Sequence, residues 1–185
     1  ETPKTLPATD VRIVARAADA LNAAATHARN LGIKTTVLGD DLEGEARNLA
    51  ADHATISRNG APSLLLSGGE TTVSVGSING RGGRNTEYLL ALALALDGDQ
   101  RVHAIACDTD GIDGTEENAG AIIGPDTLVR ARTLGLDAQA MLDAHVAYDF
   151  FSALGDLVIT GPTRTNVNDF RAILISSGAS QLIDL

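Results

Sequence analysis

The stretch Val102-His103-Ala104-Ile105-Ala106-Cys107-Asp108-Thr109-Asp110-Gly111-Ile112-Asp113-Gly114 runs from an apolar, strand-like segment straight into a loop of aspartates and glycines. The same order recurs where residues 64–66 lead into Ser67-Gly68-Gly69-Glu70, and where residues 157–159 lead into residues 160–166. In open α/β sheets, loops that leave the carboxyl ends of strands line the ligand crevice. The pattern therefore predicts an α/β domain whose strand-end loops bind a polar, phosphorylated ligand and a metal.

The composition limits the class of protein. With 185 residues, 44% hydrophobic and 21% charged, the chain is long enough for one domain with a substantial core. The net charge of −10 argues against nucleic acid and anionic membranes as partners. The leucine-rich residues 89–96 are too few to span a bilayer. A single cysteine, Cys107, excludes an internal disulfide and fits a reducing cytoplasm.

The first sixty residues alternate as a βαβα unit does, which implies parallel strands with helical crossovers. The two strand candidates are residues 11–14 and 33–38, and the two helix candidates, chosen by propensity, are residues 15–31 and 42–57. Gly39-Asp40-Asp41 is expected to form a turn after the second strand.

After Pro62 the pattern changes, because strand candidates at residues 64–66 and 71–75 are separated by a connection short enough for a hairpin. Further helices are expected at residues 87–96, 125–134, 138–144 and 149–154, and further strands at residues 102–107, 157–159 and 172–175. Residues 1–185 are therefore predicted to form a single α/β domain, with a mixed, mostly parallel sheet flanked by helices.

A glycine-rich loop precedes the leucine-rich helix. In Asn79-Gly80-Arg81-Gly82-Gly83-Arg84-Asn85, the glycines let the backbone approach a ligand, and the start of the helix offers N–H donors to an anion. Arg81 and Arg84 add bidentate donors for phosphate or carboxylate. The alternative is a surface loop with two solvated arginines, and the residues alone do not decide between the two.

Three carboxylates follow the apolar stretch within six residues. Asp108, Asp110 and Asp113 are the hard oxygen ligands that Mg²⁺ prefers, together with phosphates of a substrate. The alternative is an Asp/Gly turn in which the carboxylates cap backbone N–H groups.

A fourth loop follows residues 157–159 and carries hydroxyls, an amide and a guanidinium. It could grip a substrate carboxylate or nucleotide phosphates, or it could be an ordinary Gly-Pro turn. The residues predicted to bind substrate or phosphate are Ser67, Gly68, Gly69, Glu70, Arg81, Gly82, Gly83, Asn85, Thr163, Arg164, Thr165 and Asn166.

Two nucleotide-binding motifs are absent from the sequence. Gly80-x-Gly82 is followed by Asn85 where a dinucleotide fingerprint needs its third glycine. No phosphate-binding loop with a lysine occurs either, and the chain's lysines are Lys4 and Lys34, both outside the glycine loops. Phosphoryl transfer would therefore need arginine, a metal, or a lysine from another polypeptide segment.

Taken together, the motifs resemble the leucine-rich MOFRL region of bacterial glycerate 2-kinases, whose members often carry the name putative hydroxypyruvate reductase. The similar segments lie within residues 64–175 and are Ser67-Gly68-Gly69-Glu70-Thr71-Thr72-Val73, Gly82-Gly83-Arg84-Asn85-x-Glu87, residues 108–114, and Thr160-Gly161-Pro162-Thr163-x-Thr165-Asn166-Val167-Asn168-Asp169. Thr86 and Arg164 depart from the usual pattern, which has Gln and Gly there, and this puts the substrate in question.

The resemblance implies a kinase that phosphorylates D-glycerate at its 2-hydroxyl with ATP and Mg²⁺, in a cleft between two domains. This chain would be the C-terminal domain, and its partner the missing N-terminal domain, with a homo-oligomer left open. Arg84 and Asp110 would be catalytic, and Asp108, Asp110 and Asp113 would bind the metal. The alternatives are an NAD(P)H-dependent hydroxypyruvate reductase and a non-catalytic anion-binding module.

Overall fold

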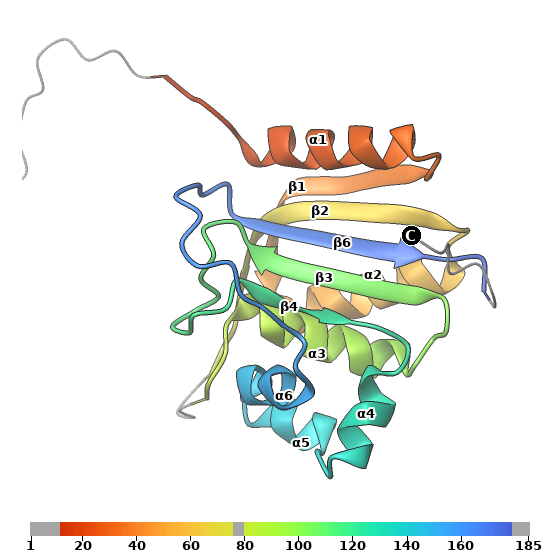
Figure 1. The fold of residues 1–185 in the computed structure, drawn as a ribbon, viewed down its shortest axis with the longest axis vertical. Helices are drawn as coiled ribbons and strands as arrows, with labels where there is room; N and C mark the ends of the chain where they lie inside the picture. The colour runs from red at the N-terminus through yellow and green to blue at the C-terminus, as the bar shows by residue number, and fades with distance from the viewer. Residues whose placement is uncertain (1–11, 76–79, 179–185) are drawn as a thin grey trace, which may run out of the picture.

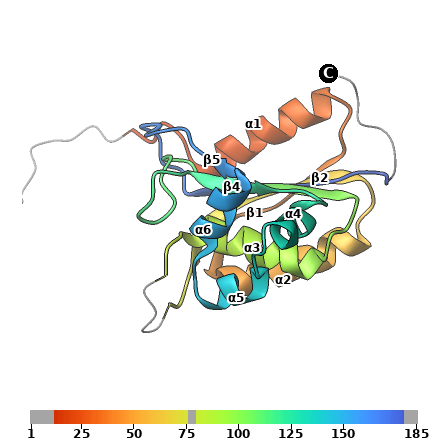
Figure 2. The same cartoon turned by 60° about the horizontal axis from the view of Figure 1, so that its bottom comes forward.

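The computed structural model of the chain describes residues 12–75 and 80–178. A six-stranded sheet in the order β1-β2-β6-β3-β4-β5 lies between two unequal layers of helices (Figures 1 and 2). The strands are β1 (Thr35–Glu45), β2 (Ser63–Thr72), β3 (Val102–Asp108), β4 (Gly120–Ile123), β5 (Leu157–Val158) and β6 (Asp169–Ile175). The helices are α1 (Ala17–Asn30), α2 (Ala46–Asn59), α3 (Arg84–Leu96), α4 (Thr127–Thr133), α5 (Ala138–Asp143) and α6 (Ala147–Leu154).

The single α/β domain with a mixed sheet is confirmed, but the expectation that the sheet is mostly parallel is wrong. Among the described strands only β1 and β2 pair in parallel, across the α2 crossover. The pairs β2–β6, β3–β6, β3–β4 and β4–β5 are antiparallel. The reason is that β6, the last of the described strands, inserts between β2 and β3 and runs against both. The residues near β6 in the sequence form no pattern that predicts this pairing.

The predicted hairpin at Ser67-Gly68-Gly69-Glu70 is also wrong, because these residues continue β2. They pair with β1 on one side and with β6 on the other. Gly69 has φ +121°, and a Cβ there would lie 2.2 Å from the carbonyl oxygen of Leu42, so glycine is what lets β1 approach so closely. The predicted turn at residues 39–41 is an irregular part of β1.

The remaining differences lie at the edges of elements. Residues 12–14 form no strand, and Val11 lies outside the described residues. Strand β4 was not predicted, because its four residues follow a long loop and begin with glycine. Helix α3 begins at Arg84, three residues earlier than expected. Asp137 caps α5, and its side chain accepts from the N–H of Ala140.

The main core lies between the sheet and α3. Residues Tyr88, Leu89, Leu90 and Leu92 are all fully buried, because α3 is surrounded by α2, the sheet and the small helices α4 to α6. On the other face, α1 packs Leu21 and Ala25 against Leu66 of β2. This packing holds the start of α3 against the carboxyl ends of β2 and β3. None of the helices within residues 12–75 and 80–178 has the length and apolar character of a membrane span.

His53 of α2 is buried against α3, and its Nδ1 lies 2.7 Å from the hydroxyl of Tyr88. Burial, together with the nearby charge of Arg171, lowers the pKa of His53 from 6.5 to about 4, against a small opposing effect of Asp52. Between pH 4 and 6.5 the unfolded chain therefore binds more protons at this site than the folded chain.

We expect the free energy of unfolding to fall as the pH drops from 6.5 towards 4, with His53 contributing up to about 1.4 kcal/mol per pH unit. Urea titrations between pH 4.5 and 7 measure this dependence. His53→Gln keeps a hydrogen-bonding partner for Tyr88 but cannot titrate, so its profile should be flatter. Parallel profiles for the two proteins would contradict the assignment.

Candidate functional site

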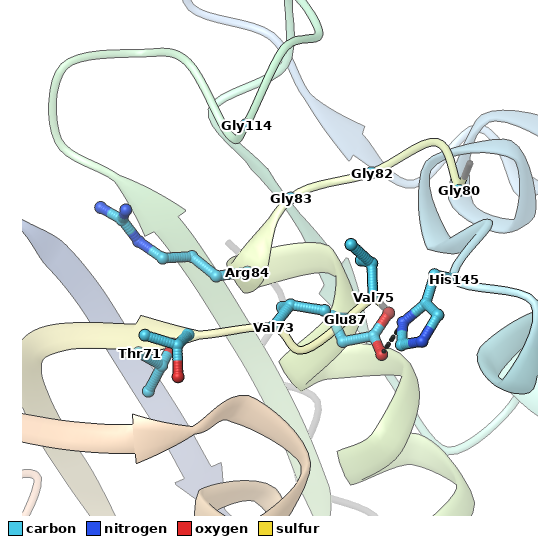
Figure 3. A pocket seen from close by; sticks show the side chains of 11 residues that line it. Thr71, Val73, Val75, Gly80, Gly82, Gly83, Arg84, Glu87, Gly114 and His145 are labelled. Carbon is cyan, nitrogen blue, oxygen red and sulfur yellow. Dashed lines mark hydrogen bonds and ion pairs between the residues drawn. The ribbon is translucent and has the colours of Figure 1, made fainter. Parts of the chain in front are cut away.

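Four segments meet where β2 and β3 end and β6 begins. A cavity of about 390 Å³ lies here, between the end of β2, the glycine loop, the first turn of α3 and the loop before α6 (Figure 3). Arg84 and Glu87 reach the cavity from α3, Thr71 from β2, and His145 from the loop that follows α5. The site is thus built on the antiparallel insertion of β6 and on the capped start of α3.

Arg84 lies at the centre of a group of carboxylates. Its Nε donates to Asp169 at 2.8 Å, its NH2 group to Asp108 at 2.6 Å, and its NH1 group to Glu70 at 3.3 Å. Burial acts to lower the pKa of Arg84, but Asp169, Asp108 and Glu70 outweigh it and raise that pKa. The guanidinium therefore stays charged and is fixed in position. Of its three carboxylate partners, Glu70 is the most exposed.

Asp108 and Asp110 lie together at the end of β3. The N–H of Asp110 donates to Asp108 at 3.2 Å, and the Asp110 carboxylate accepts from Ile112 N–H at 2.8 Å. Burial raises the pKa of Asp108 to about 6, against the opposing effects of its hydrogen bond from Asp110 and of Arg84. Two hard oxygen donors at one turn fit the chemistry of Mg²⁺ bound by one or two carboxylates together with phosphate oxygens.

Asp113 lies elsewhere, buried at the start of α3. Its carboxylate accepts from the backbone N–H groups of Asn85 and Thr86, both at 2.9 Å, and from their side chains. The structure therefore does not bring Asp113 to Asp108 and Asp110, and in the described part of the chain no group of three or more acidic, His or Cys side chains could hold a metal. Asp113 also occupies the N–H donors that the sequence offered to an anion, so the predicted anion site at this helix start is already filled by a carboxylate.

Arg81 binds the glycine loop to its neighbours. It pairs with Glu116 at 2.9 Å and with Asp149 at 3.2 Å, and its guanidinium lies 4.3 Å from the centre of the Tyr148 ring. The N–H of Tyr148 in turn donates to the carbonyl of Arg81 at 3.1 Å. In this structure Arg81 joins the glycine loop to α6 rather than reaching the cavity.

The two predicted loops at the strand ends are placed differently from each other. Ser67, Gly68 and Gly69 lie inside the sheet between β1 and β6, so only Glu70 of that group reaches Arg84. The Thr163 hydroxyl donates to the carbonyl of Thr109 at 2.5 Å, which packs the fourth loop against the acidic loop. Its remaining predicted residues, Arg164, Thr165 and Asn166, are exposed, and Arg164 has the left-handed φ of 61° that favours glycine.

Sequence reasoning missed two further groups. Asp169, the first residue of β6, pairs with Arg84 but was quoted only as part of a longer motif. Glu87 lies 2.9 Å from Nδ1 of His145 and also pairs with Arg47 of α2 (Figure 3). A buried glutamate among leucines in the first turn of α3 was the available signal, because a charge is buried there only with a partner.

The comparisons with known proteins agree with this architecture. Residues 63–169 match the MOFRL family. The chain belongs to the MOFRL family. A relative from Agrobacterium vitis, named "Putative hydroxypyruvate reductase", is 53% identical over 95% of the MOFRL chain and 42% of its own length. The D-glycerate 2-kinase of Thermotoga maritima is 34% identical over 91% of the chain and 42% of its own length.

Two solved structures have a fold similar to that of this MOFRL chain. The crystal structure of glycerate kinase from T. maritima superposes with a TM-score of 0.85 at 34% identity, covering 94% of this chain and 44% of that one. The PH0495 protein of Pyrococcus horikoshii gives a TM-score of 0.86 at 32% identity, over 95% and 42% of the two chains. The MOFRL chain thus spans less than half the length of the relatives it matches.

Proposed function

We propose that this chain forms one side of the active site of a glycerate 2-kinase, which transfers a phosphoryl group from ATP to D-glycerate. The observation that carries the proposal is Arg84, a charged guanidinium held by buried carboxylates beside a cavity at the strand ends. The kinase names of the relatives from T. maritima and P. horikoshii support it.

Phosphoryl transfer depends mainly on positioning and on electrostatic stabilisation, so the site needs little covalent chemistry. The NH1 group of Arg84 makes its longest contact with Glu70, an exposed carboxylate. A phosphate or the carboxylate of glycerate can replace Glu70 on this donor, while Asp169 and Asp108 keep the guanidinium in place. Arg84 would then bind and orient the anion.

The acidic loop would bind Mg²⁺ and accept the proton of the substrate hydroxyl. Asp108 and Asp110 would hold Mg²⁺, which when bound neutralises the charge on the phosphates. One carboxylate of this loop would accept the proton of the substrate hydroxyl as the phosphoryl group is transferred. Asp110, predicted as catalytic, lies on the same turn. A lysine and the opposite wall of the cleft would come from a further domain. The relatives are more than twice as long as the region that this chain matches, which is enough for such a domain.

The second candidate is a hydroxypyruvate reductase that uses NAD(P)H, which the name of the A. vitis relatives favours. A dinucleotide site places a pyrophosphate on free N–H donors at a helix start. At α3 those donors are bonded to Asp113. The geometry therefore favours the kinase.

A chimera tests the two functions in one protein. In it, this chain replaces the matching region of the A. vitis relative that is 53% identical. We expect D-glycerate-dependent ADP production that requires Mg²⁺, and no oxidation of NADH by hydroxypyruvate. Oxidation of NADH without ADP production would overturn the kinase proposal in favour of the reductase.

The 185-residue chain by itself should fold but turn over poorly, because its glycine loops contain no lysine and, in the proposed function, a further domain supplies one wall of the cleft. We expect ADP production far below the rate of typical kinases, roughly 1–100 per second. The same coupled assay measures it, with the chimera as the positive control. A kinase-like rate from the isolated chain would show that no further domain is needed.

A further inference from the structure

The contact between Arg84 and Asp169 differs from the other two contacts of this guanidinium. Asp169 is fully buried, whereas the side chain of Glu70 is 59% exposed. The donor to Asp169 is Nε, the nitrogen closest to the aliphatic stem. The five N–H donors of a guanidinium lie in one plane, so a bond at Nε fixes that plane and leaves donors on NH1 and NH2 for other partners. Asp169 is therefore positioned to orient the Arg84 guanidinium.

The Asp169 carboxylate is itself held from several elements. It accepts from Nδ2 of Asn85 on α3 at 2.8 Å, from the N–H of Thr71 on β2 at 3.4 Å, and from Arg171 on β6 at 2.5 Å. Donors from three separate elements leave the carboxylate little freedom to rotate. Its position is thus set by the insertion of β6 between β2 and β3.

Arg171 supplies the positive charge that compensates the buried Asp169 carboxylate. Its side chain is fully buried, donates to the Thr71 hydroxyl at 3.0 Å, and lies 5.3 Å from the centre of the Tyr88 ring. Its Nε and NH1 have no partner among the described atoms. A buried ion pair of this kind adds little net stability over apolar residues of similar size. Arg171 and Arg84 pair with the same carboxylate, Asp169, which indicates a role for Arg171 in the electrostatics of the site.

We propose that Asp169, held by the buried Arg171, is the positioning residue that orients the Arg84 guanidinium towards the cavity. Its catalytic consequence rests on the proposed function, but the orientation itself does not. The carboxylate acts through Arg84 and need not touch a ligand. Loss of its charge should release the guanidinium while leaving Arg84 present.

The first test observes Arg84 directly, in this chain and without a substrate. In ¹⁵N NMR spectra, the Nε–H of Arg84 should give a resolved, slowly exchanging signal in the wild type, unlike that of the exposed Arg132. Asp169→Asn should broaden or remove that signal. Asp156→Asn, which takes a carboxylate from Arg130 at a distant ion pair, is the matched control and should leave it unchanged.

Two results would overturn the proposal. One is a wild-type Arg84 signal that exchanges as fast as that of Arg132, which needs no variant and so holds even if Asp169→Asn fails to fold. The other is an Arg84 signal that stays protected in folded Asp169→Asn.

A double-mutant cycle in the chimera tests the catalytic consequence. Asp169→Asn should lower kcat for glycerate about tenfold or more in the wild-type background, and by less than about twofold when Arg84 is already lysine, because partners in one network are not additive. Additive losses would overturn the action through Arg84. A chimera without kinase activity would instead reject the proposed function, and the NMR result would still decide the positioning role.

Discussion

Replacing Asp113 with alanine should destabilise the fold by about 3 kcal/mol or more. The loss of a helix N-cap costs about 0.5–2 kcal/mol, and each buried donor left unpaired costs about 1–3 kcal/mol. Asp113→Ala removes the acceptor for the N–H groups of both Asn85 and Thr86, and for the Thr86 hydroxyl. All three groups are buried, so water cannot easily replace the carboxylate.

Urea unfolding of the 185-residue chain, followed by circular dichroism, measures this loss. Asp137→Ala is the matched control, since Asp137 caps the exposed start of α5 with one bond to Ala140 N–H and should cost about 1 kcal/mol. If the two variants lose the same stability, Asp113 is not the principal cap of α3 and its carboxylate is free for another role.

Replacing Arg84 with lysine should lower kcat/KM for glycerate or ATP by roughly ten- to a hundredfold in the chimera. Losing one charge-assisted hydrogen bond costs about 1.5–3 kcal/mol, and an ammonium cannot present two parallel donors to a carboxylate or phosphate. Lysine also cannot bridge Asp169 and Asp108 while offering a donor towards the cavity, as Arg84 does.

The matched control is Arg101→Lys. Arg101 also pairs closely with one carboxylate, Asp99, but it lies at the opposite end of β3. We expect kcat/KM within about twofold of wild type for that variant. An Arg84→Lys enzyme that equals wild type on both substrates would remove Arg84 from the ligand-binding groups and place the anion elsewhere in the cleft.

The sequence predicts those parts of this fold that depend on near neighbours. The apolar residues of β3, the alanine-rich α1 and the leucine-rich α3 all follow from local propensity and pattern. The direction of β6 does not, because its pairing with β2 joins residues about a hundred positions apart. A glycine pair that looks like a turn can equally let two strands approach, as at Gly69.

Part of the candidate site could also be predicted from the sequence. Arg84, Asp108 and Glu70 were all chosen from the sequence, and the structure brings them together. Asp113 was chosen for a metal because a carboxylate in an acidic loop has the same local pattern whether it binds a cation or a helix start. Asp169 was not chosen, because its pairing with Arg84 depends on where β6 inserts.

The position of β6 also bears on how this protein is synthesised. Strand β6, inside the sheet, is made after every other described strand, and until it emerges β2 and β3 have no partner on their facing edges. Unpaired strand edges favour association between chains. A nascent chain that stalls before residue 169 would hold two incomplete half-sheets, so translation pauses just before β6 should raise aggregation and chaperone demand far more than pauses before the earlier strands do.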